Sequence, residues 1–290
     1  MHDDERLAGR FEANRPRLRA VAYRMLGSLS DAEDALQEAW LRAAAADASV
    51  VANLEGWFTT IVARVCLDVL RSRKSRREEP LEPGTLDVAA AGGPEQEAVL
   101  ADSVGLALLV VLDTLPPAER VAYVLHDTFG LPFGEIAEIT GRSPGAARQL
   151  ASRARRKIQG PPAVPPARLA GQRQVAEAFL AASRGGDLDG LLAVLDPKVV
   201  LHADAAAVPS GVPVTIRGAA VVARNARAAS VRSRYSGVAL VDGTPGIVMA
   251  TRGRLVIVLA FAYSGGKIAR IDVIADPGRL EGLRLAVPGA

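Results

Sequence analysis

The chain has a single cysteine, Cys66, among its 290 residues. A lone cysteine excludes an intramolecular disulfide and a zinc cluster built from cysteines. The flanking Val65 and Leu67 are apolar, which predicts a buried and inert thiol. We expect neither a metal nor a cofactor in this protein.

Long apolar runs are also missing. The first ten residues, MHDDERLAGR, lack the apolar core of a secretion signal. Leu106 to Leu112 is apolar but ends at Asp113, far short of the roughly 18 uninterrupted apolar residues that a membrane helix needs. We therefore expect a cytoplasmic protein.

Lysine is scarce, occurring only at positions 74, 157, 198 and 267, so arginine carries most of the positive charge. The formal net charge is only +3, although the isoelectric point of the sequence is about 9.3. The cations gather in two clusters, at 71–77 and 148–157. Because contact with a duplex depends on local charge density, this modest net charge is compatible with nucleic-acid binding.

The distribution of proline and glycine divides the chain. Residues 11–77 contain proline only at Pro16 and have helical apolar spacing, and 101–158 is again helical. Residues 78–100 are rich in Pro, Gly and Ala, PPAVPP follows at 161–166, and strand-like runs dominate thereafter. We expect two all-α domains and a C-terminal α+β domain, with helical domains at 1–80 and 101–160, linkers at 81–100 and 161–170, and the last domain at 171–290.

The segment 131–158 has the pattern of a helix-turn-helix. A short helix over Glu135–Ile139 is followed by Gly141, which tolerates the left-handed backbone of a tight turn. Ser143 is then a suitable N-cap, with Pro144 at the first helical position. In such motifs the second helix enters the major groove of DNA.

This second helix carries one dense basic side. Arg148 and Gln149 lie near its start, where side chains reach base edges, and the later cations are placed to hold phosphates. The alternative is an ordinary helical hairpin with a solvated basic face. The spacing by itself favours DNA binding over that alternative.

The first helical block presents an acidic face. Ser30 to Glu33 fits a capping box, and Ala32, Ala35, Leu36, Ala39 and Trp40 form an apolar stripe behind it. Acidic residues between Asp31 and Glu38 fall outside this stripe. They form either a solvated surface or a docking face for a basic protein surface.

The next helix, at about 54–77, combines an aromatic start with a basic end. Its expected buried side consists of Leu54, Phe58, Ile61, Val62, Val65 and Val69. Trp57, Arg64, Asp68 and Arg71 are candidates for the outer side. Because aromatic rings stack on unpaired bases and arginines follow phosphates, this face suits partly single-stranded nucleic acid.

Taken together, DAEDALQEAW (31–40), GWFTTIVARVCLDVLRSRKSRR (56–77) and the run from LPPAER to RRKI (115–158) resemble bacterial sigma-70 factors of the extracytoplasmic-function (ECF) type. The resemblance covers roughly residues 8–158 and implies promoter-specific initiation with core RNA polymerase. It implies binding to the β′ clamp through Asp31, Asp34, Gln37 and Glu38, and a further contact with the β flap.

The same resemblance implies two DNA sites. The −10 element would be recognised and melted by Trp57, Arg64, Arg71, Arg73 and Lys74, with a flipped base held near the loop from Ala45 to Glu55. Capture of such a base offsets an unpairing cost of a few kcal/mol. The −35 element would be read by Ser143, Arg148, Gln149, Ser152, Arg153 and Arg156.

The C-terminal third is similar to SnoaL-like, cone-shaped α+β domains, which a subgroup of ECF factors carries behind region 4 as a regulatory domain. Three motifs of that subgroup depart from their usual form here, at Leu81–Pro83, Asp204–Ala207 and Asp276–Leu280. These departures leave the promoter interpretation intact.

Two other functions fit part of the pattern. A ligand-responsive helix-turn-helix repressor would bind duplex DNA without polymerase, but it has no need of the acidic helix at 31–38. A SnoaL-like isomerase or cyclase with a DNA-binding appendage would need a carboxylate or histidine poised in an apolar cavity. His202, Asp204, Asp242 and Asp272 are available, but no pair has a spacing that demands catalysis. We expect no enzymatic activity; a small ligand bound without turnover fits such a domain, and the sequence does not name it.

Overall fold

The computed structural model describes residues 2–48, 51–77, 105–160, 165–228, 236–251 and 254–287. Contacts within the chain define two compact units. The first contains Met1–Glu97 and Leu115–Arg156, and the second contains Ala98–Thr114 and Lys157–Ala290. The predicted linker at 81–100 and positions 161–164 of the proline-rich linker lie outside the described residues.

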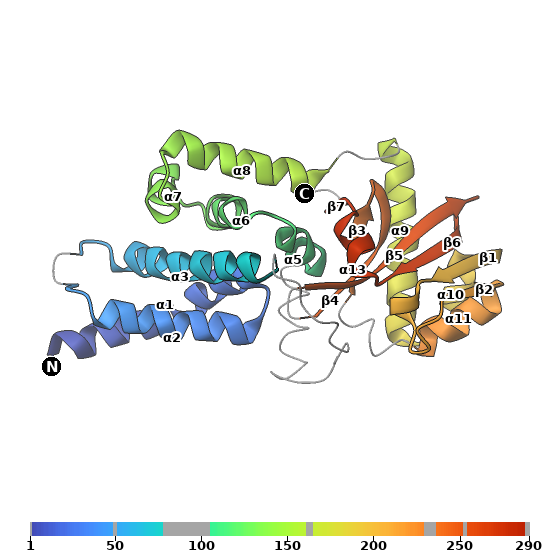
Figure 1. Ribbon diagram of the computed structural model, residues 1–290, viewed down its shortest axis with the longest axis horizontal. Helices are drawn as coiled ribbons and strands as arrows, with labels where there is room; N and C mark the ends of the chain where they lie inside the picture. The colour runs from blue at the N-terminus through green and yellow to red at the C-terminus, as the bar shows by residue number, and fades with distance from the viewer. Residues whose placement is uncertain are drawn as a thin grey trace. The chain divides into compact units, whose positions relative to one another are not determined.

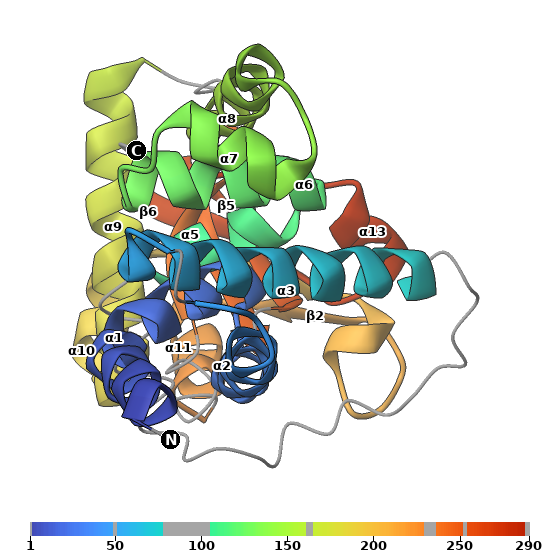
Figure 2. The same cartoon turned by 90° about the vertical axis from the view of Figure 1, so that its left-hand side faces the viewer.

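The first unit opens with α1 (His2–Leu26), α2 (Leu29–Ala44) and α3 (Leu54–Arg77). All three pack on one another, and Figure 2 shows α3 crossing over α2, which is seen nearly end-on. At their junction the Phe11 ring lies 5.2 Å from both Trp40 and Phe58, measured between ring centroids. The apolar stripes predicted on α2 and α3 therefore meet in one aromatic core.

The start of α2 differs from the prediction. The N-cap is Ser28, whose hydroxyl accepts a hydrogen bond from the Asp31 N–H at 3.4 Å. The predicted capping box at Ser30 is wrong, because Leu29 is buried within the first turn and starts the helix two residues earlier. Glu33, the expected box partner, instead pairs with Arg15 and Arg19 of α1 at 3.0 and 2.9 Å.

The helix-turn-helix prediction is confirmed. After α6 (Pro117–Tyr123) and η1 (Val124–Thr128), α7 (Phe133–Thr140) ends at Gly141, which has a left-handed φ of 67°. The Ser143 hydroxyl then accepts from the Ala146 N–H at 3.2 Å, and α8 (Pro144–Gln159) follows. This turn chemistry fixes where the second helix begins.

The second unit contains a mixed sheet of seven strands in the order β2-β1-β6-β5-β4-β3-β7 among the residues that the structure describes (Figure 1). The β1–β6 pair is parallel and the other pairs are antiparallel. The bounds are β1 (Leu195–Ala203), β2 (Val214–Arg217), β3 (Ser236–Val241), β4 (Thr244–Thr251), β5 (Arg254–Ser264), β6 (Lys267–Ile274) and β7 (Leu285–Ala286).

Three helices, α9 (Pro166–Gly185), α10 (Leu188–Val194) and α11 (Ala219–Ala228), accompany the sheet. Helix α9 begins five residues before the predicted start at 171, because a proline is tolerated in a first helical turn. Of two short elements, η2 (Ala205–Ala207) contacts β6 and α13 (Pro277–Glu281) contacts β5. A layer of helices on a sheet is the α+β arrangement expected for this part of the chain.

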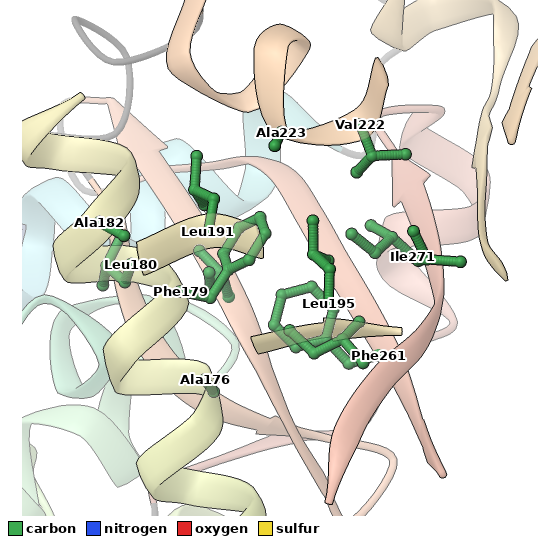
Figure 3. Packing of buried hydrophobic residues seen from close by; sticks show 13 residues of the cluster. Ala176, Phe179, Leu180, Ala182, Leu191, Leu195, Val222, Ala223, Phe261 and Ile271 are labelled. Atoms are coloured by element: carbon green, nitrogen blue, oxygen red, sulfur yellow. The ribbon is translucent and has the colours of Figure 1, made fainter. Parts of the chain in front are cut away.

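One face of the sheet is packed with apolar side chains. Phe179 of α9 and Phe261 of β5 make an edge-to-face contact at 5.3 Å, and Figure 3 shows Leu191 and Leu195 beside them. At the rim, the Tyr263 hydroxyl donates to the Pro245 carbonyl at 2.8 Å, and burial raises the pKa of this phenol. The interior of the domain is thus a packed core.

The second face of the sheet is covered over only part of its area. The run Leu255–Tyr263 predicts a strand covered on both sides, yet only Val258 and Phe261 are buried in β5. The prediction of complete coverage is wrong at Ala262, which is exposed, because the outer layer does not extend over that end. Helix α5 (Leu106–Asp113), expected with the second helical domain, contacts β3, β4, β5 and β7 within the second unit.

The buried thiol predicted at Cys66 is confirmed, since this residue is fully buried on α3. Burial, opposed by the charges of Arg120 and Arg73, raises the pKa of the Cys66 thiol from 9.0 to about 12. The thiol of the unfolded chain ionises near its ordinary pKa. The stabilising contribution of this group is therefore complete below that pKa and is lost as pH rises toward 12.

We expect a thiol reagent to leave the native protein unlabelled at about pH 9, where an exposed cysteine is largely thiolate. The same reagent should label Cys66 stoichiometrically after denaturation. If the reagent is an aromatic disulfide, each labelling reaction releases a coloured aromatic thiolate, and its absorbance measures the extent of both reactions. Rapid labelling of the native chain would contradict the buried position.

Candidate nucleic-acid interface

Helix α8 divides cleanly into a buried and an exposed side. Ala147, Leu150, Ala151, Ala154 and Ile158 are buried. The six residues predicted to read DNA from this segment all lie on the exposed side: Ser143, Arg148, Gln149, Ser152, Arg153 and Arg156. Because these positions recur at helical spacing, one face of α8 is available to a groove.

The first cation of this face is held by an aromatic stack. The Arg148 guanidinium lies over the Phe133 ring, 5.4 Å from its centroid. Phe133 in turn stacks on His126 with centroids 4.0 Å apart, and the His126 Nδ1 lies 3.0 Å from the Leu131 carbonyl oxygen. Phe133 and His126 are not predictable as partners of Arg148, because the pattern of α8 alone does not show which aromatic ring reaches it. The stack fixes the direction of Arg148.

Two other cations of α8 are bound by carboxylates of the same unit. Arg153 donates from Nε to Glu119 at 3.0 Å, and the Glu119 side chain is only 8% exposed. Arg155 donates to Asp127 at 2.5 Å. Glu119 belongs to the Leu-Pro-Pro…Glu-Arg run, so this motif fastens α6 to α8.

The outer face of α3 holds most of the second predicted site. Arg64, Arg71 and Lys74 are exposed, whereas Trp57 is half-buried and lies 5.5 Å from the fully buried Phe58. Arg64 also donates to the Glu138 carbonyl at 3.3 Å. The side chains of Arg76 and Arg77 lie outside the described residues, as do positions 49 and 50 of the loop expected to hold a flipped base.

Arg73 differs from its neighbours on α3. Its guanidinium is half-buried, donates to the Leu26 carbonyl at 3.2 Å and pairs with Asp31 at 2.5 Å. The structure thus brings together two residues that were predicted to act in separate sites. Both are engaged in joining α3 to the start of α2.

The other residues of α2 that were predicted to bind polymerase form an exposed row with Leu41. Asp34, Gln37, Glu38 and Leu41 follow the i, i+3, i+4, i+7 spacing of one helix face. Leu41 is 63% exposed and lies outside the buried apolar stripe, so the stripe pattern does not predict it. This row therefore combines one exposed apolar side chain with charged and polar ones.

The acid/base candidates of the C-terminal domain do not converge. His202 and Asp272 are register partners on β1 and β6, where His202 contacts the Thr215 hydroxyl at 2.9 Å and Asp272 accepts from Arg270 at 2.9 and 3.1 Å. Asp242 lies at the β3–β4 turn, where its carboxylate accepts from Arg284. None of these lines the cavity of about 430 Å³ beside α10 and α11, whose lining is apolar apart from Lys267.

Asp204 is fully engaged in hydrogen bonds. One carboxylate oxygen accepts from the Ala275 and Asp276 N–H groups, both at 3.0 Å, and from Arg279 at 3.3 Å. The other oxygen accepts from the Ala207 N–H at 3.0 Å. Two of the departing motifs, at Asp204 and at Asp276–Leu280, therefore meet here. The third, at Leu81–Pro83, lies outside the described residues.

Comparison with known proteins matches both helical segments to one family. Residues 10–76 match the family model for sigma-70 region 2, and residues 105–158 match that for sigma-70 region 4. The probable ECF RNA polymerase sigma factor SigI of Mycobacterium tuberculosis is 35% identical over 300 aligned residues, which cover 100% of both chains. The chain belongs to the ECF family of RNA polymerase sigma factors. The predicted family and its function in directing transcription are confirmed.

The ECF sigma factor SigJ of Mycobacterium tuberculosis is also similar to this sigma factor, with 37% identity over 299 aligned residues that cover 94% of this chain and 92% of SigJ. The crystal structure of SigJ matches with 34% identity and a TM-score of 0.47, covering 95% of this chain and 98% of that one. Among the residues that the structure describes, no helix is long and apolar enough to cross a membrane. The same residues include no cluster of three or more potential metal ligands.

Proposed function

We propose that this sigma factor reads the −35 element with α8 and captures the −10 element with α3. The observation that carries the proposal is the exposed face of α8, on which Arg148 and Gln149 stand ahead of the later cations. Arg148 is aimed by the Phe133 ring, so a base contact from it requires little further ordering. Arg153, bound to the buried Glu119, positions the helix.

On α3, we propose that the melted strand of the −10 element is bound by Trp57, Arg64, Arg71 and Lys74. Trp57 is half-buried, so one part of its ring packs on Phe58 while the rest remains available for stacking on an unpaired base. Arg73, by contrast, is engaged with Asp31 and Leu26, which suits a role in holding the helix.

Docking to core RNA polymerase is assigned to the exposed row of α2, with Asp34, Gln37 and Glu38 meeting cations of the β′ clamp and Leu41 supplying an apolar anchor. Asp31 is left to its pair with Arg73. Region 4 adds a contact with the β flap, and the protein works in the cytoplasm.

The C-terminal domain acts in this proposal as a regulatory domain without catalysis. Its interior is filled by Phe179, Phe261 and their neighbours, and none of the four acid/base candidates lines the cavity beside α10 and α11. His202 and Asp272 lie on the opposite face of the sheet from this interior. Both carboxylate oxygens of Asp204 already accept hydrogen bonds from backbone N–H groups.

Replacing both Arg148 and Gln149 with alanine is expected to reduce −35 discrimination at least about tenfold, since each good base contact contributes roughly 1–3 kcal/mol. Run-off transcription with core polymerase, on templates with intact and scrambled −35 boxes, measures the ratio. Arg10→Ala on α1, which removes an exposed cation from another face, is the matched control. Equal discrimination by the double variant and the control would refute the assignment of α8.

A further inference from the structure

The outer face of the sheet, opposite the packed interior, is apolar at one end. The register aligns Gly237 of β3 with Val248 of β4, Val248 with Val258 of β5, and Val258 with Ile274 of β6. Directly paired residues share a face. Val248 and Val258 are fully buried and Ile274 is 5% exposed, so this row is covered.

The other end of the same face is polar. A row from Arg217 through Val200 and Arg270 to Ala262 follows the register across β2, β1, β6 and β5. Both arginines and Ala262 are exposed. The outer face is therefore divided into an open polar half and a covered apolar half.

Helix α5 covers the apolar half. A Cβ atom on Gly237 would lie 3.0 Å from the Ala107 nitrogen and 3.3 Å from the Leu106 Cβ, so the missing side chain at this position admits the helix. Helix α5 also contacts β4, β5 and β7. Leu109, Val110, Val111 and Leu112 are buried, as expected for a helix that is apolar on nearly every side.

The last turn of α8 is held by the same unit. The Val287 N–H donates to the Ile158 carbonyl at 2.7 Å, just beyond the two-residue strand β7. β7 pairs with β3 through Leu240 and Val241 and also contacts α5. A Cβ on Gly160 would lie 2.5 Å from the Ala286 Cβ, so the chain leaving α8 runs directly against β7.

Resting on the proposed function of α8, we propose that the C-terminal domain is a two-point clamp on region 4. The matched segment 105–158 begins with α5 and ends with the last turn of α8, and both ends are seated on the C-terminal domain. The row Gly237, Val248, Val258 and Ile274 under α5 forms an apolar seat for this helix. In the proposal, this seat and the strand β7 hold the −35-reading segment in the form that binds DNA. Helix α5 stays on the sheet while the promoter is bound.

A disulfide trap tests whether α5 stays docked. The pair Leu106→Cys and Gly237→Cys places two Cβ atoms about 3.3 Å apart, just under the usual separation in a disulfide, and Cys66 is buried and does not compete. Leu106→Cys also removes most of the leucine side chain, which makes room for the new thiol, and Gly237→Leu lacks this room. We expect the bond to form equally in the free protein and in the complex with core polymerase and promoter. The locked and reduced forms should differ in −35 discrimination by less than about fivefold.

Three results would overturn the clamp: no disulfide in the free protein, protection of the thiols in the promoter complex, or a locked form whose discrimination changes by more than about fivefold. Gly237→Leu, which fills the seat, should lower −35 discrimination about tenfold. Ala262→Leu adds the same side chain to the open half of the face and should match wild type. Should Gly237→Leu prevent folding of the second unit, the disulfide trap still decides.

The second anchor is tested by Val287→Pro, which removes the N–H that donates to Ile158 and also restricts φ at this position. Its preceding residue, Ala286, is already in a strand, as the residue before a proline prefers. We expect Val287→Pro to lose −35 discrimination while Val287→Ala retains it, and equal behaviour of the two counts against the clamp. Core polymerase binding, assigned to α2, should be unchanged in every variant. If the wild-type protein did not bind core polymerase at all, that result would instead refute the proposed function.

Discussion

Phe58→Ala should cost the first unit about 3–5 kcal/mol of unfolding free energy, the usual range for emptying a phenylalanine site in a core. Phe58 is fully buried and packs edge-on against Phe11 at 5.2 Å. Both tryptophans of the chain, Trp40 and Trp57, belong to the first unit, so their fluorescence during urea unfolding reports this unit alone.

The adjacent Trp57→Ala is the matched comparison. Trp57 is half-buried, so its removal should leave the unfolding midpoint much closer to that of wild type, followed here by the remaining Trp40. Promoter opening should nevertheless fall, because base–aromatic stacking contributes about 1–3 kcal/mol per base. Permanganate footprinting of the −10 region measures opening. A Trp57→Ala variant that opens promoters normally would contradict the role assigned to this ring.

Asp204→Ala should have the second largest effect, at about 2–4 kcal/mol, because it leaves several partly buried N–H donors without an acceptor. Those donors belong to Ala207, Ala275 and Asp276, and the change also leaves Arg279 without this carboxylate. Circular dichroism, which follows both units, should show an earlier transition of the second unit, whereas tryptophan fluorescence should be unchanged.

Asp272→Ala is the control for Asp204. Asp272 lies on the polar half of the outer face and pairs with Arg270, whose side chain is 56% exposed. An exposed ion pair contributes at most about 1 kcal/mol, so this variant should unfold almost as wild type does. If the Asp204 and Asp272 variants unfolded alike, the structural role of Asp204 would be rejected.

The turn chemistry of region 4 could be predicted from sequence because it is local. Gly141, Ser143 and Pro144 each act on backbone groups within a few residues, and the structure places all three as expected. The cap of α2 was missed because Ser28 and Ser30 are equally good by type. Only the burial of Leu29 distinguishes them, and burial depends on the fold.

Partners far apart in sequence could not be predicted. Arg73 and Asp31 both carry charges that suit external ligands, and nothing local shows that they lie 2.5 Å apart. The partner of α5 is also distant in sequence, because the apolar run of this helix predicts that it is buried but not which surface buries it. The register of β3 with β4 and β5, which creates that surface, is a long-range property of the sheet.

The carboxylates bound to α8 bear on how this helix meets a phosphate backbone. Binding to a duplex releases condensed counterions in proportion to the phosphates that the protein neutralises. Glu119 and Asp127 already balance Arg153 and Arg155, so these two arginines add little to that release. For the −35 contact proposed for α8, we therefore expect an ionic-strength dependence set by fewer cations than the sequence of the helix contains.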